Sequence, residues 1–218
     1  MSLRRGGIVG AMRITKFGHA CVRIEHDGQQ VVIDPGGFTD REAVDGATAV
    51  LVTHEHFDHL DEDNLRATEA PIHTIQAVVD QLPPDLAERA TVVQPGSSFS
   101  VGLPVTSVGE MHAVIHPSFP RFHNSGYLVT AGDTTLYHPG DSFELPGRPV
   151  DVLCAPVSGP WLKMAEVLDF SEAVGAPRTL AIHDRLLSDV GLGMFDQRMP
   201  AFLEGVGTYQ RVADGDDL

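Results

Sequence analysis

From residue 13 onward, short apolar runs alternate with clusters of glycine, proline and aspartate. Runs of strand length cover residues 13–17, 21–25, 30–33, 49–53, 72–74, 91–94, 99–101, 105–108, 127–130, 134–137, 152–155 and 179–182. Asp27-Gly28 and Gly132-Asp133 each separate two of these runs, which is typical of β-hairpins. Residues 49–53 are apolar up to the last position, which indicates a strand buried on both faces.

Two segments have helical character. Residues 75–81 are followed by Pro83 and Pro84, which favour a helix that stops there. In the second half, apolar side chains recur at helical spacing before Gly175, at Met164, Val167, Phe170 and Val174. Strands dominate both halves and helices lie between them, so the pattern predicts a layered α/β fold with sheets inside and helices outside.

The two halves share a local pattern. A strand is followed by Asp34-Pro35-Gly36 in the first half and by His138-Pro139-Gly140-Asp141 in the second half. This similarity suggests an internal duplication.

The first twelve residues lack the strand pattern. They pair two arginines with a short apolar stretch that glycine dilutes, so we expect residues 1–12 to be a disordered leader or an over-long start. Residues 13–218 are then expected to form a single domain. The chain contains no run of eighteen apolar residues, so no membrane-spanning helix is expected.

The charge balance and the cysteine count limit which binding partners and which compartment are expected. The chain has 15 Lys and Arg against 30 Asp and Glu, a net charge of −15, which argues against a nucleic acid or an anionic membrane. Two cysteines, Cys21 and Cys154, make a disulfide framework unexpected and favour a reducing compartment, hence the cytoplasm. We therefore expect a small-molecule substrate, with a homo-oligomer left open.

The strongest chemical signal is the segment Thr53-His54-Glu55-His56-Phe57-Asp58-His59. His54 and His56 follow a strand, where residues two apart point to the same side and can share one metal ion. Asp58 and His59 come after a turn and can face a second ion. A helical His-Glu-x-x-His zinc motif is excluded because Asp58 stands four residues after His54.

Other apolar runs also end at a histidine or an aspartate. Asp34, His112, Asp141 and His183 each stand shortly after a predicted strand. Strand ends in layered α/β proteins gather at one edge of the sheets, where loops build a site. Asp34 and Asp141 alone would be ordinary turn residues, and His112 and His183 alone would be core histidines. Together they indicate a shared site.

The His-x-His-x-Asp-His block, His112, Gly140-Asp141 and His183 resemble the metallo-β-lactamase superfamily over residues 13 to about 199. Gly18-His19-Ala20 and the segment from Tyr137 to Asp141 resemble the branch of metal-dependent hydrolases that includes ascorbate-6-phosphate lactonase. The resemblance implies a four-layer αββα sandwich with its active site in a cleft at the strand ends. The Gly-Gly that follows the histidine block in glyoxalase II-like members is absent, since Leu60-Asp61 stands there.

The resemblance also implies a ligand set. His54, His56 and His112 would hold one ion, Asp58, His59 and His183 would hold the second, and Asp141 would bridge them. Asp34 and His19 would lie behind the ligands and orient them. Imidazole and carboxylate ligands without a thiolate suit two zinc ions, and also manganese or iron.

His116 leaves an alternative open, because it lies four residues after His112 and could be the third ligand instead. The proton donor to the leaving group is also open among His116, His123 and His19, with Asp58 as the further catalytic residue. Pro160-Trp161-Leu162-Lys163 follows a predicted strand, so Trp161 could pack against substrate and Lys163 could meet an anionic group. Residues 117–124 form a loop that could cover the site through Phe119, Arg121 and Phe122.

The sequence thus predicts a metal-dependent hydrolase that uses a metal-bridging hydroxide to cleave a small ester, lactone or phosphoester. Two alternatives share the ligand block. One is a dioxygenase with a single iron held by two histidines and an aspartate, and the other is a metal-binding domain without turnover. Cleavage of β-lactams does not follow from the superfamily's name.

Overall fold

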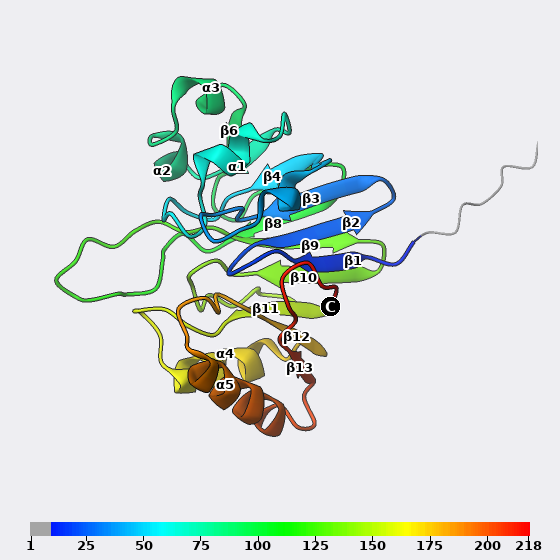
Figure 1. Cartoon of the computed structure of the whole chain (residues 1–218), viewed down its shortest axis with the longest axis vertical. Coiled ribbons are helices and arrows are strands. Elements are labelled where there is room, and N and C mark those ends of the chain that lie inside the picture. The colour runs from blue at the N-terminus through cyan, green and yellow to red at the C-terminus, as the bar shows by residue number, and fades with distance from the viewer. Residues whose placement is uncertain (1–9) are drawn as a thin grey trace, which may run out of the picture.

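The computed structural model describes residues 10–218, which form two facing β-sheets (Figure 1). The first sheet contains, in spatial order, β1 (Arg13–Lys16), β2 (Val22–His26), β3 (Gln29–Ile33), β4 (Ala49–Leu51), β5 (Ile72–Thr74) and β6 (Ala90–Val92). The strands β1 to β3 pair antiparallel, and β3 to β6 pair parallel.

The second sheet has the same plan with one more strand. Its spatial order is β13 (Thr208–Gln210), β12 (Arg178–Ile182), β11 (Val152–Pro156), β10 (Thr134–His138), β9 (Gly126–Ala131), β8 (Pro104–Val108) and β7 (Ser98–Ser100). Antiparallel pairing from β7 to β10 is followed by parallel pairing from β10 to β13. In each half, a hairpin therefore leads into parallel strands, which is the repeat that the sequence suggested.

Helices cover the outer faces of both sheets (Figure 1). The helices α1 (Glu62–Arg66), α2 (Gln76–Val79) and α3 (Pro84–Ala87) lie on the first sheet. The helices α4 (Met164–Val174) and α5 (Asp189–Phe202) lie on the second sheet. A 3-10 turn, η1 (Arg41–Val44), packs near β3. The mixed α/β fold with two sheets between helices is the predicted αββα arrangement.

Alternation along the strands explains the layers. In β4, Ala49 and Leu51 point into the core between the sheets, and Val50 points outward to the cluster that contains Leu65 of α1. The inter-sheet core is completed from the second sheet by Val129, Leu136, Val152, Cys154, Leu180 and Ile182. Because both faces of β4 are buried, its sequence is continuously apolar.

Several short elements were not predicted. α1 is one of them, and Asp61 caps its N-terminus by accepting a hydrogen bond from the Asn64 amide at 2.8 Å. α5 is the largest omission, because Gly191, Gly193 and Pro200 obscure its periodicity. It is held in place by packing of Phe195 and Met199 against α4 and β12, which sequence periodicity does not reveal.

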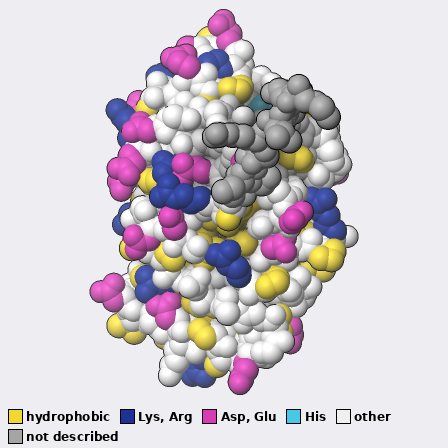
Figure 2. Space-filling model, turned by 90° about the vertical axis from the view of Figure 1, so that its right-hand side faces the viewer, with side chains coloured by type: hydrophobic (Ala, Val, Ile, Leu, Met, Phe, Trp, Pro, Cys, Tyr) yellow, Lys and Arg dark blue, Asp and Glu magenta, His cyan; other side chains and the backbone are white. Residues whose placement is uncertain are grey.

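Residues 1–9 of the predicted leader lie outside the described residues. Met12, at its end, packs against the inter-sheet core. Within residues 10–218, none of the helices combines the length and apolarity needed to cross a membrane. Figure 2 shows one face of the molecule, on which side chains of both charges are dispersed among isolated hydrophobic ones.

A buried ion pair fastens the C-terminal segment to the strand ends. Lys16 in β1 is 1% exposed, and its Nζ lies 3.1 Å from Asp184 and 2.8 Å from Asp214. The backbone of the same segment also bonds to β1, through Leu218 N to Ile14 O at 2.9 Å. Because Asp184 follows His183, Lys16 also supports the loop that carries this histidine.

We predict that Lys16→Ala lowers the free energy of unfolding by about 3 kcal/mol, because it leaves the buried Asp184 carboxylate without its partner. Lys163, the chain's other lysine, is 82% exposed and provides the matched control. Lys163→Ala should change stability by less than about 0.5 kcal/mol. Urea denaturation of both variants tests this, and equal midpoints for the two would contradict it.

Candidate metal centre

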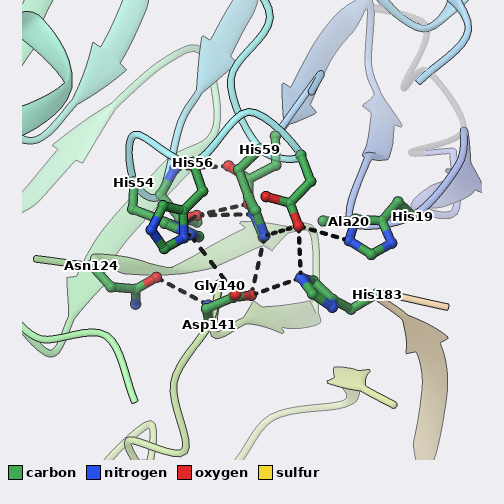
Figure 3. Close-up of polar contacts among 12 residues, drawn as sticks. His19, Ala20, His54, His56, His59, Asn124, Gly140, Asp141 and His183 are labelled. Atoms are coloured by element: carbon green, nitrogen blue, oxygen red, sulfur yellow. Dashed lines mark hydrogen bonds and ion pairs between the residues drawn. The ribbon is translucent and has the colours of Figure 1, made fainter. Parts of the chain in front are cut away.

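The predicted ligands meet where strands of the two sheets end (Figure 3). Asp34 follows β3, the block from His54 to His59 follows β4, and Asp141 follows β10. His112 follows β8 and His183 follows β12, so the first sheet contributes two of the loops that carry these residues and the second sheet contributes three. The sheet topology thus gathers residues that are far apart in the sequence.

Two groups of side chains offer ligand atoms that lie within 4.8 Å of one another in each group. His54, His56, His112 and Asp141 form the first group, and His19, Asp58, His59 and His183 form the second group. The third histidine of the first group is therefore His112, not the alternative His116.

Asp141 lies between the two groups. Its Oδ2 is 3.2 Å from His112 Nε2 in the first group. Its Oδ1 is 3.1 Å from His59 Nε2 and 3.2 Å from His183 Nε2 in the second group. One carboxylate thus presents one oxygen to each group, which is the geometry that a bridging ligand requires.

Asp34 orients the ligands from behind. Its buried carboxylate accepts hydrogen bonds from the Thr53 amide at 2.7 Å and from Thr53 Oγ1 at 2.8 Å. Its Oδ2 also lies 2.7 Å from His59 Nδ1. Asp34 therefore holds the proton of His59 on Nδ1 and leaves Nε2 free to face Asp141.

Hydrogen bonds also fix which nitrogen of the neighbouring histidines carries the proton. Thr53 Oγ1 donates to Asp34, so at 2.9 Å it accepts from His54 Nδ1. His112 Nδ1 donates to the Ala113 carbonyl at 2.6 Å, and His183 Nδ1 donates to the Ser158 carbonyl. In all these rings Nδ1 carries the proton of its hydrogen bond, so Nε2 is the inward-facing nitrogen that can bind a metal ion.

Several of the inward-facing atoms have no hydrogen-bond partner. Four of them are buried and have no hydrogen-bond partner within residues 10–218, namely His59 Nε2, His112 Nε2, His183 Nε2 and Asp141 Oδ1. Buried polar atoms without partners are costly and rare in folded proteins. These four atoms converge on one region, and all are nitrogen or oxygen atoms that can bind metals, so the residues present fit bound cations.

His19 belongs to the second group by distance but not by hydrogen bonding. Its Nδ1 accepts a hydrogen bond from the Arg185 amide at 3.2 Å, so the proton is on Nε2. That Nε2 lies 3.1 Å from Asp58 Oδ2 and donates to it. His19 therefore orients Asp58, and its protonated nitrogen cannot bind a metal.

Burial and neighbouring charges shift the pKa values of the side chains in the centre. Burial lowers the pKa of His54 well below its usual range, and burial likewise lowers the pKa of His19 to about 4. Burial also acts to lower the pKa of His183, but Asp141 and Asp58 outweigh it and raise the pKa to about 9. For Asp141, burial opposes ionisation, but His183 and His59 hold its pKa well below the usual range.

Trp161 and Lys163, the predicted substrate contacts, lie in different surroundings. Trp161 is buried, and its indole N–H donates to Asp141 Oδ2 at 2.8 Å. Lys163 points to solvent, 3.6 Å from Glu166. Gly159 makes the position of Trp161 possible, because a Cβ there would lie 2.7 Å from the indole nitrogen. Trp161 thus positions the Asp141 carboxylate as well as lining the cleft, and Lys163 does not line it.

A cleft of about 270 Å³ leads to the centre. Its lining residues are His56, Phe57, Asp58, His112, Ile115, Asp141, Pro160, Trp161, His183 and Leu186. The loop predicted to cover the site borders an adjoining cavity, lined among others by Ile115, Phe119, Arg121 and Phe122. His116, just before this loop, is exposed and bonds to Ser118 at 2.6 Å, and His123, near the end of the loop, borders a different cavity together with Gln94 and Glu110. Neither histidine lines the cleft.

Backbone strain is concentrated at the centre. Among non-glycine residues from 10 to 218, positive φ angles occur at Asp27, a hairpin turn, and at His19, Asp34 and His183. The last three place their side chains toward the ligands. Conformations of this kind are held only where the surrounding structure fixes them.

Sequence reasoning missed several contributors. Thr53 links Asp34 to His54, and Asn124 Oδ1 accepts from the Asp141 amide at 3.0 Å. The only signal for Thr53 was a hydroxyl at the end of an apolar run. No signal in the sequence points to Asn124, or to Phe57, Ile115 and Leu186 in the cleft wall.

Comparison with known proteins gives a consistent result. A family model described as the beta-lactamase superfamily domain matches residues 13–183. The chain is 35% identical over 195 residues to protein Rv0786c of Mycobacterium tuberculosis, covering 86% of this chain and 91% of that one. It is 29% identical over 142 residues to a UPF0173 metal-dependent hydrolase of Pyrobaculum aerophilum, covering 60% and 62%.

A solved structure shows the same fold. The crystal structure of a metal-dependent hydrolase from Parabacteroides distasonis superimposes with a TM-score of 0.75 at 19% identity. The superposition covers 92% of each chain.

We predict that Thr53→Val weakens divalent-metal binding by about 10- to 100-fold, because it removes the hydroxyl that orients His54 and Asp34. Competition with a chromophoric chelator measures this. Thr135→Val removes a hydroxyl on β10 that pairs with Thr130, and serves as the matched control with unchanged affinity. Equal affinities for both variants would refute the orienting role of Thr53.

We also predict that the chelator-treated protein loses thermal stability as the pH rises from about 6.5 to 9. The pKa of His183 is raised to about 9 in the folded chain, above the value near 6.5 of an unfolded histidine. A raised pKa contributes stability that is complete below the unfolded pKa and is lost as the pH passes the folded pKa. Thermal unfolding with and without metal tests this, since a ligated His183 carries no proton on Nε2. His183→Gln should flatten the metal-free profile, and a flat profile in the unmodified protein would contradict the prediction.

Proposed function

Because the chain belongs to the beta-lactamase superfamily domain family, we propose that it is a dinuclear metal-dependent hydrolase that cleaves a small ester, lactone or phosphoester. The carrying observation is that the two oxygens of Asp141 face two separate histidine groups. Five imidazoles and two carboxylates without a thiolate suit two zinc ions, with manganese or iron as alternatives. The printed name of the Pyrobaculum aerophilum relative, a metal-dependent hydrolase, supports the same reaction class.

In this proposal, His54, His56 and His112 hold one ion, Asp58, His59 and His183 hold the other, and Asp141 bridges them. Two such ions would lower the pKa of a shared water and polarise the carbonyl or phosphoryl group under attack. The protein supplies fixed ligand orientation, through Asp34, Thr53, His19 and Trp161, so that little reorganisation accompanies the reaction.

Asp58 acts as a ligand and an oriented acceptor. Burial opposes its ionisation, but hydrogen bonds from His183 and His19 outweigh burial and hold the pKa of Asp58 below its usual range. The carboxylate is therefore ionised at neutral pH and is a weak base, so it is poorly matched to carrying a proton through the reaction. The role predicted for His116 as proton donor draws no support from its exposed position 2.6 Å from Ser118.

A redox enzyme with a single iron is the second candidate. It would need only two histidines and an aspartate from this centre, and it would leave the inward-facing nitrogens of the other group unsatisfied. The geometry favours two ions for that reason.

The proposal also includes a small-molecule substrate, a cytoplasmic location and a finer likeness to ascorbate-6-phosphate lactonase. It leaves a homo-oligomer open.

Metal content distinguishes these functions. Protein purified without added metal or chelator should contain about two equivalents of zinc or manganese by elemental analysis. About one equivalent of iron, together with oxygen consumption, would favour the redox enzyme. No metal in the purified protein and none taken up on addition would refute both enzymes.

We predict that His112→Ala loses metal and hydrolase activity, because it removes an inward-facing ligand. His116→Ala provides the matched control, four residues away on the same loop, and should keep both. Circular dichroism checks that each variant is folded. Loss of metal from His116→Ala, with metal retained in His112→Ala, would overturn the ligand assignment.

A further inference from the structure

The residues that line the cleft indicate which class of substrate it can bind. The residues that line it beside the ligands are apolar, namely Phe57, Ile115, Pro160, Trp161 and Leu186. Phe57 is 64% exposed and Leu186 is 52% exposed, so large apolar side chains stand at the entrance where water would otherwise favour polar ones. The apolar lining residues come from four loops, which follow β4, β8, β11 and β12.

The apolar surface extends away from the ligands. Ile115 lines both the cleft and the adjoining cavity of about 290 Å³. The second cavity is bordered by Val114, Pro117, Phe119, Pro120 and Phe122, among others. A substrate whose reacting group lies at the ligands can therefore extend an apolar chain past Ile115.

The residues that line the cleft include no lysine or arginine. The nearest candidates are engaged elsewhere, since Arg185 pairs with Asp214 and Lys163 lies beside Glu166 in solvent. Arg121 borders the second cavity and a further one beside Glu144, but it does not line the cleft, and its Nε donates to the His112 carbonyl at 2.9 Å. The non-reacting oxygens of a phosphate group would find no charged donor from the protein here.

From these observations we infer that the substrate is a neutral carboxylic ester or lactone with an apolar acyl portion, and not a phosphorylated compound. This inference rests on the proposed hydrolase function and narrows it. Water adds to the carbonyl carbon, the bond from that carbon to the ester oxygen breaks, and one water proton goes to the leaving oxygen. The acid that forms releases its remaining proton to solvent as a carboxylate.

Product binding tests the inference without relying on turnover. Trp161 is the chain's sole tryptophan and lines the cleft, so its fluorescence reports on occupancy. We expect hexanoate to bind about 10- to 100-fold more tightly than acetate, because each buried methylene strengthens binding about fourfold when fully buried. Inorganic phosphate should bind no more tightly than acetate. Equal affinities for acetate and hexanoate, or tighter binding of phosphate than of hexanoate, would overturn the inference.

Turnover by the metal-loaded protein provides the second measurement. kcat/KM should rise from p-nitrophenyl acetate to p-nitrophenyl hexanoate and should be at least about tenfold lower for p-nitrophenyl phosphate. Faster cleavage of the phosphate would refute the substrate class while leaving the hydrolase intact. Chain-length-dependent binding without hydrolysis of either series would refute the proposed function while supporting the apolar specificity of the cleft.

Two matched variants test whether Leu186 contributes to the preference for the longer acyl chain. Leu186→Ala should reduce the preference for hexanoate over acetate by about threefold to tenfold, because it shortens the cleft wall. Val190→Ala, on α5, changes a side chain that is 76% exposed and does not line the cleft, so the preference should be unchanged. Equal effects of the two variants would overturn the assignment of Leu186.

Discussion

The buried carboxylate of Asp34 is the interaction on which the arrangement of the centre depends. It stands at the end of β3 with a positive φ angle and accepts hydrogen bonds from Thr53 and His59 at the end of β4. A buried charge is tolerated only when its hydrogen bonds are met, so Asp34 fixes the relative positions of the two loops. Because Thr53 in turn accepts from His54, one carboxylate orients a histidine in each group.

Both sheets contribute residues to the centre. Each consists of a hairpin followed by parallel strands, so each presents strand ends at one edge. The first sheet supplies the histidine block, and the second sheet supplies His112, Asp141 and His183. Neither half holds a complete set of ligands, and the shared apolar core between the sheets keeps the halves in register. The fold is therefore a precondition of the chemistry.

The surface and the cleft differ in character. The chain carries a net charge of −15, but the entrance to the centre is formed by apolar side chains. Two divalent ions in the proposed centre would supply the local positive charge that draws an electrophile's oxygen, without any cationic residue in the wall. This combination suits a neutral substrate, because the acidic surface disfavours anions and the apolar wall stabilises a hydrocarbon portion.

The sequence by itself determined most of the strands and the layered architecture, and it singled out the histidines and aspartates that the fold brings together, because alternation, buried runs and the His-x-His-x-Asp-His block are local patterns. It did not determine α5, whose glycines and proline hide a helix that tertiary packing stabilises. Nor did it show that Trp161 bonds to Asp141, that Lys163 faces solvent, or that His19 donates to Asp58. These roles depend on contacts between residues distant in the sequence, such as the bond from the Arg185 amide that decides which nitrogen of His19 carries the proton. Only the tertiary structure brings such groups within hydrogen-bonding distance.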